Sequence, residues 1–262
     1  MTAGTALRAA LAVETLKLRR STVARIATAL LVLLVPLGSV GMVALARSPQ
    51  AVGPTAAKLA DYATGDLATT HLLVCGQVLS VAALAAGGFF VAWSFGRELE
   101  SGTAGALFGL AVPRGTVALA KCLVALAWIT SCVVLAVAVT TAVSAVVAGV
   151  SGEPFAAWTG ARDAVAAGLL GGGLALPFAW VATVTRSQIG TVGALVGMVA
   201  FTQIVVLLGG TWFPYAAPSL WAGMGGADAA AAVGPPHLML AAAMAPLGAA
   251  AVVHAWRRLT NV

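Results

Sequence analysis

The fold is decided by the stretch CLVALAWITSCVVLAVAVTTAVSAVVAG at residues 122–149, which contains no charged side chain. An α-helix rises about 1.5 Å per residue, so roughly twenty apolar residues cross the ~30 Å hydrocarbon core of a bilayer. The strands of a membrane β-barrel are only about ten residues long and alternate in polarity, unlike this unbroken run. We therefore predict a transmembrane helix over residues 120–149.

Similar apolar runs lie on both sides of this stretch and account for most of the chain. Hydrophobic residues make up 61% of the 262 residues and charged residues only 8%, against roughly 25% charged in an average soluble domain. A soluble protein cannot bury that much apolar surface. We predict an all-α polytopic membrane protein that forms a single transmembrane domain over residues 1–262. The six predicted spans are residues 26–46, 71–95, 120–149, 164–185, 189–210 and 237–256.

The lysines and arginines indicate how the chain is oriented, because basic residues are enriched in cytoplasmic loops. Six spans with both termini inside leave only Arg47, Lys58 and Arg162 of the 14 basic residues outside. An odd number of spans would put Arg257 and Arg258 on the outer side. We predict a protein of the bacterial inner membrane with both termini cytoplasmic. The inner basic residues are Arg8, Lys17, Arg19, Arg20, Arg25, Arg97, Arg114, Lys121, Arg186, Arg257 and Arg258.

Two segments outside the spans carry further structure. Residues 5–20 place Leu7, Leu11 and Leu18 on one helical stripe. This pattern predicts a basic amphipathic helix on the cytoplasmic face, with its basic side chains toward anionic lipid head groups. Residues 211–236 are rich in aromatic residues and prolines and are too broken to span the membrane. We predict a broken extracytoplasmic hairpin there, after the fifth span.

Small residues and prolines occur within the later spans. Gly171–Gly173 and Pro177 lie in the fourth span, and Gly193 and Gly197 form a G-x-x-x-G pattern in the fifth. Small faces let helices approach closely, and prolines permit kinks. We predict that the G-x-x-x-G pattern packs within the subunit.

The spans carry no recognisable chemistry of their own. An ionisable side chain in the middle of a span would be the default functional site, but the acids and bases cluster at span ends. Cys75, Cys122 and Cys132 lack C-x-x-C spacing and are predicted to be small packing residues. No lysine follows a glycine, so the sequence has no P-loop. We predict no catalytic residue, metal site or cofactor in this chain, so active transport would need a partner as its energy source.

Charge is concentrated between the second and third spans, at residues 96–119. A short helix followed by a Pro-Arg turn would protrude there into the cytoplasm, although a solvated loop that only fixes topology would carry the same charges. The charged residues of this region are Arg97, Glu98, Glu100 and Arg114, followed by Lys121.

This loop resembles the first cytoplasmic loop of ABC-2-type exporter permeases. In that family a glutamate is followed by Gly-Thr, a small apolar stretch, Pro-x-Ser-Arg and Lys. Here an acidic pair precedes Gly102 and Thr103, Pro113 and Arg114 follow about ten residues later, and Lys121 lies seven residues further on. The chain departs from the pattern because Pro113 directly precedes Arg114. The six spans, the N-terminal helix and the broken hairpin also match the plan of the family.

The resemblance implies the membrane subunit of an ATP-binding cassette exporter, which moves an amphipathic drug, antibiotic, peptide or lipid outward. Two such subunits, as a homodimer or pseudo-dimer, would bind separate cytoplasmic ATPase subunits that hold ATP and Mg²⁺. The loop would sit in a groove on the ATPase, with Glu98 and Glu100 facing basic groups there. The residues implied in this coupling are Arg97, Glu98, Glu100, Gly102, Thr103, Pro113 and Arg114.

The substrate would pass along spans 1, 2 and 5, where Gln77, Ser80 and Gln203 are candidate polar contacts. The same three side chains could instead hydrogen-bond neighbouring helices.

Two other functions stay open. A lipid-metabolism enzyme or a membrane anchor would not co-purify with a cassette ATPase, and an ion-coupled secondary transporter would keep working without ATP.

Overall fold

The computed structural model describes residues 2–49, 52–101 and 112–259, apart from the side chains of residues 55–58. It is 83% helical, with no strand in those ranges. Six helical segments are long and apolar enough to cross a membrane. The chain is therefore an all-α polytopic membrane protein, as the sequence predicts.

Three of the six spans are built from more than one helical element. Span 1 consists of α2 (Thr22–Ala29), the π-helix η1 (Leu30–Leu34) and α3 (Val35–Ala46). Span 2 consists of α5 (Leu67–Val91), the π-helix η2 (Ala92–Gly96) and α6 (Arg97–Glu100). Span 3 is α8 (Arg114–Ser151), span 4 is α9 (Trp158–Gly173) with α10 (Pro177–Thr185), span 5 is α11 (Gln188–Leu207), and span 6 is α14 (Pro235–Arg258).

Within the part of the chain that the structure describes, four further helices lie outside the spans. The first, α1 (Ala3–Arg20), precedes span 1, and α4 (Pro54–Ala63) follows it. The short helices α12 (Ala217–Trp221) and α13 (Ala227–Ala231) form the broken hairpin between spans 5 and 6. The hairpin and the separate N-terminal helix confirm the predicted plan.

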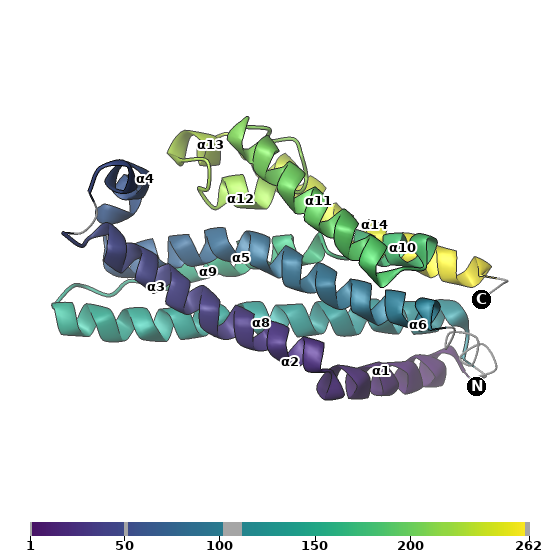
Figure 1. The fold of residues 1–262 in the computed structure, drawn as a ribbon. Coiled ribbons are helices and arrows are strands. Elements are labelled where there is room, and N and C mark those ends of the chain that lie inside the picture. The colour runs from purple at the N-terminus through teal and green to yellow at the C-terminus, as the bar shows by residue number, and fades with distance from the viewer. Residues whose placement is uncertain (1, 50–51, 102–111, 260–262) are drawn as a thin grey trace.

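The helices run roughly along one long direction (Figure 1), with α5, α8 and α9 packed against one another. The N and C labels lie at the same end of the molecule, where α1, α6 and the last turns of α14 are found. We call it the basic end, because it carries Lys17, Arg97, Lys121 and Arg257. The helices α4, α12 and α13 lie at the opposite end.

The tightest packing in the bundle joins α9 to α5. A Cβ at Gly171 would overlap the backbone carbonyl of Ser80, so only glycine allows this approach. Leu72 and Leu79 of α5 and Val133 of α8 are fully buried around it. These small and branched residues hold α5 at the centre of the molecule.

The helices flanking the predicted loop 96–119 extend into it from both sides. Span 2 continues to Glu100 because no proline interrupts it after Leu67. Span 3 begins at Arg114, directly after Pro113, which caps the helix and needs no hydrogen-bond acceptor for its nitrogen. The charged residues of the loop therefore belong to the ends of two spans.

The fourth span differs from its predicted form. Its helix begins at Trp158 rather than at residue 164, and turns interrupt it between Gly173 and Pro177. Proline at this position cannot donate the hydrogen bond of a continuous helix, so the interruption has a local cause.

In α1 the face buried against the rest of the chain carries Ala6, Ala10 and Glu14, and the predicted leucine stripe is half-buried. Its placement on the membrane surface stays a prediction. One expectation about a helix face needs correction. In α11, Gly193 and Gly197 are exposed, and a Cβ at either would meet no described atom within 4 Å. The prediction that this G-x-x-x-G pattern packs within the subunit is therefore wrong for the residues that the structure describes.

Candidate functional site

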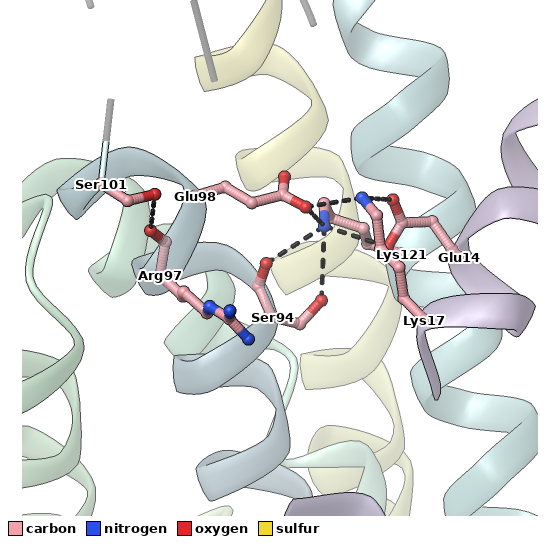
Figure 2. A network of polar contacts seen from close by, with 7 residues as sticks. All are labelled: Glu14, Lys17, Ser94, Arg97, Glu98, Ser101 and Lys121. Carbon is pink, nitrogen blue, oxygen red and sulfur yellow. Dashed lines mark hydrogen bonds and ion pairs between the residues drawn. The ribbon is translucent and has the colours of Figure 1, made fainter. Parts of the chain in front are cut away.

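Four charged side chains meet inside the basic end, and we call them the charge quartet: Glu14 and Lys17 from α1, Glu98 from α6 and Lys121 from α8. Oxygens of Glu14 lie 2.7 Å from Lys17 Nζ and 3.0 Å from Lys121 Nζ. Oε1 of Glu98 lies 2.7 Å from Lys17 Nζ and 2.9 Å from Lys121 Nζ. Figure 2 shows the side chains converging from three helices. The quartet thus joins three segments that are far apart in the sequence.

The sequence of α1 explains how its two members reach the quartet. The hydroxyl of Thr2 accepts a hydrogen bond from the Thr5 backbone N–H and starts the helix. Ala6, Ala10 and Glu14 are spaced four apart, so they share one face of the helix. The two alanines are small enough for α1 to pack closely against α8, which carries Glu14 inward.

Lys121 is the most enclosed member of the quartet, with 1% of its side chain exposed. Its ammonium group donates to Glu14 Oε2 at 3.0 Å and to the backbone carbonyl of Ser94 at 3.1 Å, in addition to its Glu98 contact. It also lies 5.7 Å from the centre of the Phe95 ring. An ammonium group has three donors, so this environment satisfies it without water.

The charges of the quartet balance, with two carboxylates against two ammonium groups. Burial opposes the charge on Lys17, but its hydrogen bonds to Glu14 and Glu98 outweigh that penalty and raise its pKa above the ordinary 10.5. Its stabilising contribution is therefore fully present below pH 10.5 and is lost only as the pH rises through the higher folded-state pKa. Lys17 therefore stays charged at neutral pH.

The quartet can transmit displacement between helices but has no evident catalytic chemistry. Pulling one charged member away would leave its partners buried without a counter-charge, which is costly. Displacing α1, α6 or the start of α8 alone would therefore break these ion pairs. Residues 102–111 connect α6 to α8, so the quartet braces both ends of that connection.

The implied coupling residues have different surroundings. The Glu98 side chain is 14% exposed and forms ion pairs with Lys17 and Lys121, so it stabilises the fold of this chain. Glu100 is exposed, and its Oε2 accepts from the Gln188 backbone N–H at 3.4 Å, beside the start of α11. Arg97 is exposed and lies 5.8 Å from the Trp93 ring centre.

The remaining implied coupling residues lie on either side of the undescribed stretch. Pro113 is exposed at the cap of α8, and Arg114 is half-buried in its first turn. Gly102 and Thr103 lie outside the described residues. The coupling role itself stays a prediction for all seven residues.

Two of the three candidate substrate contacts have hydrogen-bond partners within the chain. Gln77 is buried, and its Oε1 accepts from the Tyr62 hydroxyl at 2.9 Å, joining α5 to α4. Ser80 is buried and lies 2.9 Å from the Ser219 hydroxyl, joining α5 to α12. Gln203 is half-buried in α11. The first two side chains therefore hold the helices of the opposite end against α5, which favours the structural alternative for them.

Sequence reasoning missed Glu14 as a site residue and treated Lys17 as a topology signal. It used Lys121 as a topology signal and as the last residue of the loop pattern, without predicting its ion pairs. One available signal was the period-four row Ala6, Ala10, Glu14, in which an acid continues a small-residue face. Another was the position of Lys121 two turns inside an apolar helix, where an ammonium group requires a partner.

Among the described residues, no group of three or more His, Cys, Asp or Glu side chains is placed to hold a metal ion.

The helices, the hairpin and the ion-paired basic end together define a six-span integral membrane protein. Its family follows from comparison with known proteins. A family model described as ABC-2 family transporter protein matches residues 10–203, so the chain belongs to the ABC-2 transporter family. No curated protein matches the chain.

Proposed function

We propose that the chain is the permease subunit of an ATP-binding cassette exporter, which moves an amphipathic drug, antibiotic, peptide or lipid out of a bacterial cell. The family match over residues 10–203 carries the proposal. That region includes the whole charge quartet. A force applied by a partner at residues 102–111 would reach α1, span 2 and span 3 together through these ion pairs.

The energy source in this proposal is a separate cassette ATPase, since the family implies association with such a subunit. ATP and Mg²⁺ are bound by that partner, and the permease holds no cofactor. Two permease copies, identical or homologous, would meet in the inner membrane. The basic end faces the cytoplasm in this arrangement, because basic residues favour that side.

Reconstitution tests the proposal. The chain and its cognate ATPase are placed in liposomes, a fluorescent amphipathic dye and ATP are added outside, and accumulation of the dye in the lumen is followed. We expect ATP-dependent transport from the pair, and neither ATP hydrolysis nor transport from the chain alone. A matched preparation carries an ATPase variant that binds ATP without hydrolysing it. Transport that persists with this variant, or hydrolysis by the chain alone, would contradict the proposal.

A further inference from the structure

A cleft of about 690 Å³ lies at the basic end, between the α1–α2 elbow and the turn from η2 into α6. Arg20 and Val23 line it from the elbow, and Trp93 and Arg97 line it from the other side. The volume falls within the range of about 300–1,000 Å³ that is usual for small-molecule sites. The charge quartet forms part of its lining.

The cleft has an excess of positive charge. Four cationic side chains line it, and its two carboxylates, Glu14 and Glu98, both contact Lys17 and Lys121. The excess therefore comes from Arg20 and Arg97, which are exposed. Neither guanidinium has an ion-pair partner among the described residues. These two groups favour an anion, and a phosphate is the anion that guanidinium geometry suits best.

The cleft also has an apolar wall, which an inorganic anion would not need. Leu16 is 49% exposed and Val23 is 36% exposed on the elbow side. Phe90 and Trp93 lie opposite, with their ring centres 5.8 Å apart. A ligand that uses both the arginines and this wall must be an anionic amphiphile.

The position of the cleft indicates where such a ligand would come from. Arg20 lies two residues before Thr22, where span 1 begins, and Arg97 lies in the last turn of span 2. Both arginines are therefore at a membrane–water boundary, where arginine and tryptophan side chains contact lipid head groups. We propose that the cleft binds an anionic phospholipid, with its phosphate at Arg20 and Arg97 and its acyl chains along Leu16, Val23 and Trp93. This binding does not depend on the proposed export function.

Quenching of Trp93 by brominated lipid tests the proposal on the purified chain in detergent micelles. Because the chain has seven tryptophans, the signal of Trp93 is obtained as the difference between the parent and Trp93→Phe. Phosphatidylglycerol and phosphatidylcholine with the same brominated acyl chains are titrated in parallel. We expect phosphatidylglycerol to quench Trp93 at a clearly lower mole fraction.

Charge variants locate the site. The substitution pair Arg20→Gln and Arg97→Gln should weaken the preference for phosphatidylglycerol by about fivefold per arginine. The matched control pair is Arg8→Gln and Arg19→Gln, which removes the same charge from exposed positions of α1 outside the cleft lining. We expect the control pair to keep the preference.

Three outcomes would overturn the proposal. Equal quenching by the two lipids would show no head-group recognition, and equal losses in both charge pairs would show only general attraction to the micelle. Relief of the quenching by millimolar inorganic phosphate would show a site for a free anion, since a lipid held by its acyl chains should resist that competitor. No ATPase is present, so these results are independent of whether Arg97 takes part in coupling.

Discussion

At the residue scale, the free energy of the basic end depends on how Lys121 is compensated. Its ammonium group is removed from water, and Glu14, Glu98 and the Ser94 carbonyl replace most of that solvation. Lys121→Met keeps the approximate volume of the side chain and removes its charge, so the two carboxylates are left to share the single ammonium group of Lys17. We expect a loss of on the order of 3–5 kcal/mol in the free energy of unfolding. Unfolding by SDS titration in mixed micelles measures this free energy for the variant and the parent.

The control for this prediction is Arg19→Met, which removes a positive charge from an exposed position of the same helix bundle. It should change the free energy of unfolding by about 0.5 kcal/mol or less. Adding Glu14→Gln to Lys121→Met should recover part of the loss, since it removes one of the two repelling carboxylates. A loss below about 1 kcal/mol for Lys121→Met would show that the quartet does not stabilise the fold.

Glu98 and Glu100 are expected to give different phenotypes, although they are only two residues apart. Glu98→Ala breaks the quartet, so we expect a lower free energy of unfolding by about 3 kcal/mol. Glu100 is exposed, so Glu100→Ala should leave unfolding within about 0.5 kcal/mol of the parent. If Glu100 contacts the ATPase, the same variant should still reduce co-purification of that subunit.

Pull-down of the cognate ATPase, measured beside the unfolding of each variant, separates the two roles. Unchanged co-purification with Glu100→Ala would contradict its coupling assignment. Unchanged unfolding with Glu98→Ala would contradict the structural assignment of that residue.

The sequence located the charged loop but not the partners of its charges. Glu98 and Lys121 were both visible as charges near span ends, where topology alone explains them. Lys121 also pairs with Glu14, which lies 107 positions away and reaches it only because α1 packs against α8. No local pattern encodes such a contact. The contact forms only because the small alanine face of α1 packs against α8.

At the element scale, the contact between α9 and α5 should be the most sensitive to side-chain size. Gly171→Ala places a methyl group against the carbonyl of Ser80, and backbone cannot move aside as a side chain can. We expect the two helices to separate, with a loss of about 1–3 kcal/mol in the free energy of unfolding. The measurement is again SDS titration in mixed micelles.

Gly197→Ala is the matched control, because a Cβ there would meet no described atom within 4 Å. Alanine favours a helix over glycine by up to about 1 kcal/mol, so this variant should be neutral or slightly more stable. Equal losses at both positions would show that the helix contacts do not distinguish the two glycines.

The six spans could be predicted from the sequence, because hydrocarbon thickness imposes a minimum apolar length on each helix. Their boundaries could not be predicted as well. Span 2 runs to Glu100 and span 3 starts at Arg114, so charged residues continue helices that apolarity alone would end earlier. The exposed faces of Gly193 and Gly197 were also missed, since a spacing pattern does not say which helix is adjacent.

At the scale of the whole molecule, the quartet and the N-terminal helix lie at one end, and the α12–α13 hairpin lies at the other (Figure 1). The distribution of basic residues predicts that the quartet end is cytoplasmic. Labelling of single cysteines from outside the cell tests this orientation. The native residues Cys75, Cys122 and Cys132 are buried and free, so each is first replaced with alanine.

In that background, Asp61→Cys, Phe155→Cys and Asp228→Cys place thiols at the end opposite the quartet, where all three native residues are exposed. An impermeant maleimide added to intact cells should label them, because the predicted topology puts that end outside. Ser101→Cys and Ser187→Cys lie at the basic end and should react only after the membrane is permeabilised. Permeabilised cells also control for expression and thiol accessibility. Labelling of Ser101→Cys in intact cells, with Asp228→Cys protected, would invert the orientation and place the quartet on the side that a cytoplasmic ATPase cannot reach.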